Sequence, residues 1–149
     1  MTPGNAPTKK DRPAKAEPRS GAGTGRKPRA VGHQLADLVA SAAAEHKPID
    51  PVLLDLSGRS PVADWFFIAS AAGARQLTAI AEKIIRRARD RGVRPLGLEG
   101  LGGDTWVLVD LGEVVVHLFN QEARTLYDLE GLWTDAPRQS PASAAERAL

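Results

Sequence analysis

Asp110 and His117 are two ionisable residues in an otherwise apolar stretch, and this makes them the first candidates for chemistry. They belong to the segment TWVLVDLGEVVVHLF, which runs from Thr105 to Phe119. A carboxylate and an imidazole that lie close together can act as a general acid and base, or bind a metal ion. The simpler interpretations are a hydrogen bond between them or to the backbone, or a surface that a partner protein covers. The sequence of this segment leaves these alternatives open.

A metal centre would need further ligands, and the available carboxylates are poorly placed for it. Glu113 falls in the turn after Asp110, and His117 is expected to face away from at least one of the two. Asp55 and Asp64 are the other carboxylates considered for a two-metal site, in which the ions lie about 4 Å apart. Each lies at the end of a predicted strand, where carboxylates commonly cap turns. We therefore predict no metal site and no catalytic residue.

The sequence lacks the common motifs of nucleotide-binding and hydrolytic enzymes. It contains no G-x-G-x-x-G after a strand, no G-x-x-x-x-G-K-[ST], no G-x-S-x-G and no H-E-x-x-H. The glycine-rich Gly97–Gly103 segment leads into a predicted strand, so it lacks the helix N-terminus that would bind an anion. There is no cysteine, which excludes disulfides and a thiol nucleophile. No cofactor is expected.

Hydrophobic periodicity predicts the elements that position these residues. Apolar residues recur at helical spacing in Gly32–Lys47 and, most regularly, in Ala74–Arg91. A third helix, Gln121–Leu132, is predicted to close the domain. Runs rich in β-branched and aromatic residues predict five strands, at Val52–Leu56, Asp64–Ser70, Val93–Leu98, Thr105–Leu111 and Val114–Phe119.

The order of these elements predicts one mixed sheet. Alternation along Thr105–Leu111 places Trp106, Leu108 and Asp110 on one face, and the residues between them on the other. The apolar run Trp65–Ile68 does not alternate, which indicates a central strand buried on both faces. We therefore expect an α/β (α+β) domain: a single mixed β-sheet of about five strands, with helices packed on its faces.

Charge divides the chain into a body and two tails. Residues 1–30 carry eight Lys/Arg against two acids, whereas the remainder carries 12 Lys/Arg against 16 Asp/Glu. We expect residues 1–30 to be a basic disordered tail, 31–133 the folded domain, and 134–149 a frayed C-terminal tail rich in Ala, Ser and Pro. The basic tail is a candidate for weak contact with RNA or another polyanion, although a solubilising role is favoured because it has no aromatic residue to stack on bases.

Other charge and hydropathy features favour a cytosolic protein. Arginines cluster late in Ala74–Arg91, where complementing the helix dipole is preferred over RNA binding. No apolar run reaches the roughly 20 residues of a membrane span, and the N-terminus lacks the apolar core of a secretory signal. We expect a cytoplasmic location and no membrane partner.

Several motifs together resemble the ribosomal silencing factor (RsfS, or Iojap-like) family. The most distinctive are a Trp strand with D-L-G-E-V-V-V-H, at Trp106–His117, and the closing R-T-L-Y-D-L-E-G-L-W, at Arg124–Trp133. The others are D-P-V-L-L-D-L-S-G-R-S at Asp50–Ser60, V-A-D-W-F-F-I-A-S at Val62–Ser70, A-I-A-E-K-I at Ala79–Ile84 and P-L-G-L-E-G at Pro95–Gly100. The resemblance covers nearly the whole predicted body.

This resemblance implies a non-enzymatic translation factor. Members of the family bind the large ribosomal subunit through its fourteenth protein and block its joining with the small subunit. They thereby repress translation when nutrients are scarce. Their fold is similar to that of nucleotidyltransferases without the active site. Two further expectations are a weak contact of the basic N-terminal tail with ribosomal RNA, and a homodimer off the ribosome, because apolar strand edges could pair.

Carried over residue by residue, the family's partner-binding surface falls on eight positions: Leu98, Glu99, Gly100, Trp106, Asp110, Leu111, His117 and Arg124. Trp106, at an expected exposed strand start, would be the aromatic anchor, and Glu99 and Asp110 would face basic groups of the ribosomal protein. Two alternatives are a nucleotidyltransferase-like, metal-dependent enzyme that uses Asp110 and His117, and a general RNA-binding module driven by the basic tail.

Overall fold

A six-stranded mixed sheet forms the centre of the protein. The structure, a computed structural model, describes residues 29–141, and the side chains from residue 33 onward. The strands are β1 (Ile49–Asp55), β2 (Trp65–Ala71), β3 (Gly97–Glu99), β4 (Trp106–Asp110), β5 (Val114–Asn120) and β6 (Arg138–Gln139), in the spatial order β3-β4-β5-β2-β1-β6. The helices are α2 (Arg29–Ala44), α3 (Ala74–Asp90), α4 (Gln121–Tyr127) and the 3₁₀ helix η2 (Leu129–Trp133). The predicted fold class is confirmed, with one strand more than expected.

Strand β2 is the centre of the sheet, as its non-alternating sequence predicts. It pairs in parallel with β5 and antiparallel with β1, and all seven of its residues are buried. The other ladders in the described part of the chain are antiparallel. A strand buried on both faces needs a cover on each side, so β2 determines where the helices must pack.

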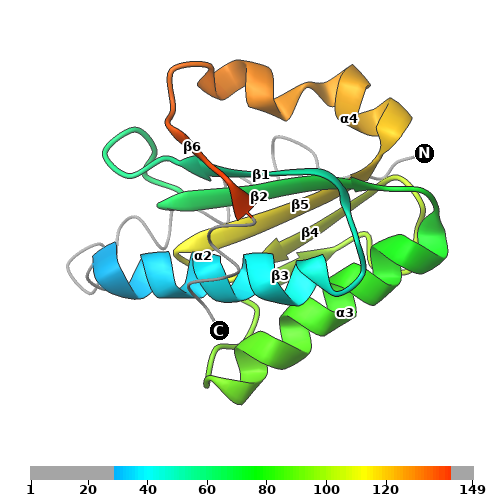
Figure 1. The fold of residues 1–149 in the computed structure, drawn as a ribbon, viewed down its shortest axis with the longest axis horizontal. Coiled ribbons are helices and arrows are strands. Elements are labelled where there is room, and N and C mark those ends of the chain that lie inside the picture. The colour runs from blue at the N-terminus through cyan, green and yellow to red at the C-terminus, as the bar shows by residue number, and fades with distance from the viewer. Residues whose placement is uncertain (1–28, 142–149) are drawn as a thin grey trace.

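The helices form one layer on each side of the sheet (Figure 1). Helices α2 and α3 cover one face, where Val107 and Val109 of β4 join the larger hydrophobic cluster. Helix α4 and η2 lie over the other face, where Trp106 and Leu108 join the smaller cluster. The predicted alternation of β4 is therefore confirmed. No helix of the described residues is long and apolar enough to span a bilayer.

Local backbone chemistry moves several predicted boundaries. Helix α2 ends at Ala44, three residues early, and Lys47 then adopts a positive φ of 51°. Strand β3 is shorter than predicted, because Pro95 has no N–H and the ladder with β4 begins only at Gly97. Helix α4 stops at Tyr127, because Asp128 has a φ of 45° and the chain continues as η2.

Strand β6 was not predicted. Its two residues lie in the segment that the composition assigns to a frayed C-terminal tail, and they pair antiparallel with Leu53 and Leu54 of β1. Asp55 N also donates to the Pro137 carbonyl, at 2.9 Å. Two-residue strands carry almost no periodic signal, which explains why the pattern missed it. The basic tail predicted at 1–30, except its last two residues, and the end of the C-terminal tail, 142–149, lie outside the described residues.

The turn after β3 requires glycine at position 100 for two reasons. Gly100 has a φ of +79°, and a Cβ atom there would collide with the Trp106 carbonyl oxygen. Gly102 has a similar φ of +93°, but a Cβ atom there would meet nothing within 4 Å. The two positions share backbone strain and differ in steric contact.

We predict that Gly100→Ala destabilises the protein more than Gly102→Ala. Both substitutions carry a strain of about 1 kcal/mol, and Gly100→Ala adds a clash with fixed backbone, for a total of about 3 kcal/mol. Urea unfolding measured on both variants checks this. Equal losses at the two positions would contradict the close approach of Gly100 to β4.

Candidate functional site

His117 is held by a hydrogen bond from Trp106. Trp106 Nε1 donates to His117 Nδ1 at 3.2 Å, and both side chains are buried on the α4 face of the sheet. An indole N–H can only donate, so Nδ1 must be the acceptor and the imidazole is neutral. His117 also lies against the Phe66 ring, with 4.6 Å between centroids. The arrangement is that of a core histidine that orients a tryptophan.

Asp110 holds the β4–β5 turn. Its Oδ1 accepts a hydrogen bond from Gly112 N at 2.9 Å, and the side chain is 5% exposed. The backbone hydrogen bond anticipated from the sequence is therefore confirmed for Asp110. Asp110 faces Val115 across the ladder, whereas His117 faces Leu108, so the two ionisable residues are not directly opposite each other.

The two other aspartates considered for a metal site, Asp55 and Asp64, lie at turns next to β1 and β2. Asp55 Oδ1 accepts from Ser57 N at 3.0 Å and caps the turn after β1, as predicted. Asp64 N donates to the Glu113 carbonyl at 2.9 Å and joins the β2 start to the hairpin turn. Among the residues that the structure describes, no three His, Asp or Glu side chains gather closely enough to hold a metal ion.

Trp106 is buried, which corrects the expectation of an exposed strand start. It is 3% exposed because Phe119 and Tyr127 pack against its ring, each with centroids 4.8 Å away. Tyr127 of α4, which is 44% exposed, forms the outer layer of this stack. A partner that approaches here would meet Tyr127 first, and Trp106 supports it from below.

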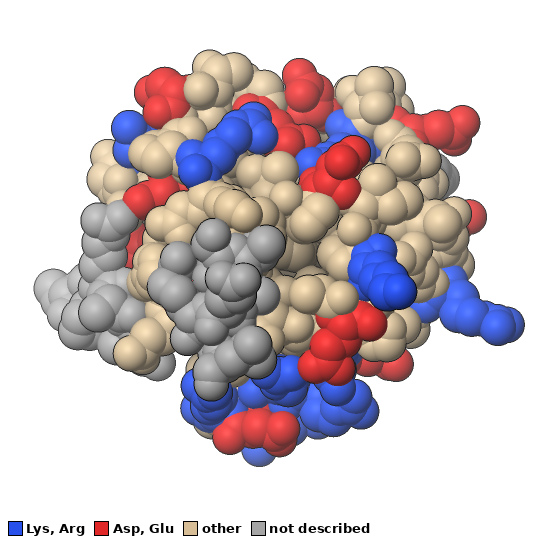
Figure 2. All heavy atoms as spheres, in the orientation of Figure 1, with Lys and Arg blue, Asp and Glu red and all other residues tan. Residues whose placement is uncertain are grey.

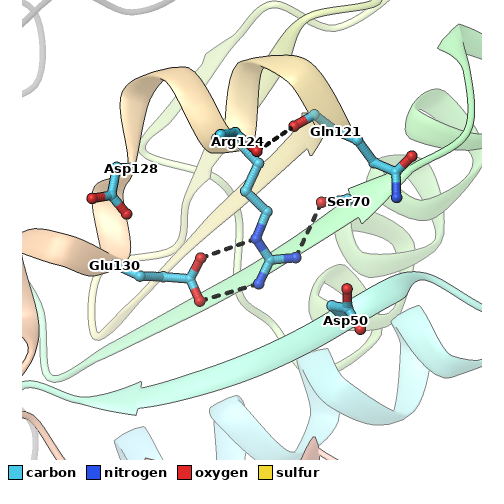
Figure 3. A pocket seen from close by; sticks show the side chains of 7 residues that line it. Asp50, Ser70, Gln121, Arg124, Asp128 and Glu130 are labelled. Atoms are coloured by element: carbon cyan, nitrogen blue, oxygen red, sulfur yellow. Dashed lines mark hydrogen bonds and ion pairs between the residues drawn. The ribbon is translucent and has the colours of Figure 1, made fainter.

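Arg124 joins α4 to the sheet and to η2 (Figure 3). Its guanidinium donates to both carboxylate oxygens of Glu130, at 3.0 and 3.2 Å. It also donates to Ser70 Oγ at 3.1 Å and to the Ile49 carbonyl at 3.2 Å. The hydrogen bond from Arg124 lowers the pKa of Glu130 below its ordinary value, and Arg138 acts in the same direction.

A polar pocket of about 530 Å³ opens beside this ion pair. Figure 3 labels most of the residues that line it, which are Asp50, Ser70, Gln121, Arg124, Thr125, Asp128 and Glu130. The Arg124 guanidinium already donates hydrogen bonds to three protein groups, so its role is to hold α4, η2 and the sheet together.

The other predicted site residues separate into core and surface. Leu111 is 3% exposed and belongs to the cluster beneath α2 and α3. Leu98, Glu99 and Gly100 lie on β3 and the turn after it, at the open edge of the sheet. Of the eight predicted positions, these three form a continuous outer surface.

Exposed leucines extend this surface beyond the predicted residues. We call Leu96, Leu98 and Leu101 the β3 leucine surface; they are 61%, 43% and 39% exposed. Sequence reasoning missed Leu96 and Leu101. The available signal was a run of leucines that alternate with Pro and Gly next to a predicted edge strand.

Comparison with known proteins identifies the family. The family model described as "Ribosomal silencing factor during starvation" matches residues 30–148. The chain belongs to the ribosomal silencing factor family. It is 44% identical over 100 residues to the ribosomal silencing factor RsfS of Bacillus subtilis, which spans 66% of this chain and 85% of that protein.

A solved structure and a more distant relative are also similar to this chain. A crystal structure of a Chromobacterium violaceum protein superposes with a TM-score of 0.64 at 33% identity, covering 67% of this chain and 83% of that one. A mouse protein named "Mitochondrial assembly of ribosomal large subunit protein 1" is 29% identical over 101 residues, which are 66% of this chain and 44% of that protein. The resemblance inferred from the motifs is confirmed.

We predict that Trp106→Phe destabilises the fold by about 1 to 3 kcal/mol, because it leaves the buried Nδ1 acceptor of His117 without its donor. Urea unfolding of this variant checks the loss. His117→Leu in the Trp106→Phe background should cost much less than His117→Leu alone, since the bond is already gone. Strictly additive losses would contradict the bond.

We predict that Glu130→Gln removes a pH-dependent part of the stability. Because the folded-state pKa of Glu130 lies below its ordinary value of 4.5, its contribution is complete above pH 4.5 and is lost as the pH falls through the lower pKa. The variant should be less stable by about 1 to 3 kcal/mol at pH 7, and the difference should shrink below pH 4. Thermal unfolding across this pH range checks it, with exposed Glu82→Gln as the control, which should show neither effect.

Proposed function

We propose that this protein binds the large ribosomal subunit through its fourteenth protein, acts in the cytoplasm, and blocks joining with the small subunit. Translation is thereby repressed, notably when nutrients are limiting. The single observation that carries the proposal is the match to the silencing-factor family model over residues 30–148. The name of the mouse relative, which refers to the large ribosomal subunit, supports the choice of subunit.

The β3 leucine surface is the best-supported contact region for this partner. It combines exposed apolar side chains with an acidic neighbour, Glu99, on the edge strand of the sheet. Leu98 pairs with Val109 and Glu99 pairs with Leu108, so the side chains of Leu98 and Glu99 point to opposite faces of the sheet at this edge. Apolar anchors beside a carboxylate suit a basic ribosomal protein, because burial supplies affinity and charge complementarity supplies orientation.

The buried residues of the predicted site hold this edge in position. Asn120 N donates to the Thr105 carbonyl at 3.0 Å, and Asn120 Nδ2 donates to the Asp104 carbonyl at 2.8 Å, which fixes the loop that follows β3. Gly100 packs directly on the Trp106 carbonyl. Trp106, His117 and Asp110 are positioning residues in this proposal. Tyr127 packs on Trp106 on the opposite face of the sheet from Leu98.

The repression would be steric. A folded domain of about a hundred residues, seated on the face of the large subunit that meets the small subunit, occupies space that the joined ribosome needs. No reaction is required. Asp110 accepts a hydrogen bond from Gly112, and His117 accepts one from Trp106, so both side chains have structural roles. Neither residue offers a reactive group on the surface.

We predict that Leu98→Asp with Leu101→Asp abolishes co-sedimentation with isolated large subunits, because two carboxylates would replace the apolar anchors. The matched control is Leu132→Asp, at a leucine of η2 that is 72% exposed and lies outside the β3 leucine surface. The wild-type protein and the control should pellet with large subunits and not with small ones. Equal binding of the double variant would contradict the assigned surface, and failure of the wild type to bind would contradict the proposed function.

A further inference from the structure

Four arginines form an exposed patch at the C-terminal end of α3. We call Arg86, Arg89, Arg91 and Arg94 the arginine patch; all four side chains are exposed. Arg86 and Arg89 lie on the outer face of α3, and Arg91 and Arg94 follow in the segment that leads to β3. Figure 2 shows Lys and Arg side chains gathered at the edge of the molecule where this end of α3 lies in Figure 1.

In the described part of the chain, the ion pairs of α3 involve basic residues outside this patch. Lys83 and Arg87 pair with Glu45 after α2, at 3.0 and 2.8 Å, and so tie the two helices together. Within the described residues, no arginine of the patch forms an ion pair. Two exposed acids, Glu82 and Asp90, lie nearby, so the patch retains a net positive charge.

The helix dipole does not account for this number of charges. The C-terminal end of a helix carries about half a negative charge, which one or two basic residues satisfy. Four exposed guanidinium groups gathered at one end repel each other, which disfavours their clustering in the free protein. A surface on which positive charges cluster despite this repulsion is typical of a surface that binds a polyanion.

We propose that the arginine patch binds the phosphate backbone of ribosomal RNA while the β3 leucine surface contacts the protein partner. This inference rests on the proposed function. Guanidinium groups match phosphate oxygens in a bidentate geometry, and a basic protein would be repelled by them. Arg94 precedes Leu96 by two residues, and Leu98 lies on the same face of the sheet as α3, because it pairs with Val109. The two surfaces are therefore adjacent and can engage one ribosomal site together.

The test measures how salt affects binding of the full-length protein to isolated large subunits. Arg89→Ala with Arg91→Ala removes two charges from the patch. Lys47→Ala with Arg59→Ala removes two exposed charges elsewhere, after α2 and in the turn after β1. If the patch contacts phosphates, the slope of log K against log salt should become less steep by about 2 for the patch variant, with at least a tenfold loss of affinity at low salt. The control should leave the slope unchanged.

Two further measurements separate the partners. Binding to the isolated fourteenth protein should be unchanged in the patch variant, and its loss would overturn the inference by showing that the patch faces protein. An unchanged salt slope with large subunits would also overturn it, while leaving the proposed function intact. Protein-free large-subunit rRNA is the second probe. The wild-type protein could fail to bind subunits and still bind this RNA, with a salt slope that becomes less steep in the patch variant. That result would contradict the proposed function and support the RNA site.

Discussion

The parallel pairing of β2 with β5 is the constraint on which the rest of this structure depends. Both strands lie inside the sheet, and β2 is buried along its whole length. A parallel pair requires a long crossover connection, and the chain supplies it as α3 followed by β3 and β4. Burial on both faces then requires a second layer, which α4 and η2 provide. The edge strand β3 and its exposed leucines are a product of that crossover, because the chain must leave the covered centre before it returns as β5.

Much of this fold could be predicted because its signals are long and periodic. The apolar stripe of α3 predicts a helix buried on one face, and the unbroken apolar run of β2 predicts a strand buried on both faces. Both elements form as expected. The errors occur where one residue or one pair of residues decides the outcome. Asp128 enters the left-handed region and divides the closing helix, and β6 exists only through its pairing with β1. Such features depend on tertiary contacts, which short sequence windows do not contain.

The candidate site was harder to predict than the fold, for a related reason. An ionisable residue in an apolar strand has the same sequence signal whether it performs chemistry or completes a hydrogen bond in the core. His117 and Asp110 complete such bonds, with Trp106 and Gly112. Arg124 also has a structural role, because its guanidinium forms an ion pair with Glu130 inside the protein. The surface is marked instead by leucines that remain exposed, and exposure can be judged only once the sheet order places β3 at an edge.

The two borders of the sheet differ in what they offer to another chain. On one side β6 covers β1 with only two residues, which gives an incoming strand little backbone to pair with. On the other side β3 presents its ladder groups beside three exposed leucines. A second copy that added a strand at β3 would cover the border of the sheet that carries the exposed leucines. Strand addition at β3 would therefore compete with the partner contact proposed for the β3 leucine surface, because both would use the same edge of the sheet.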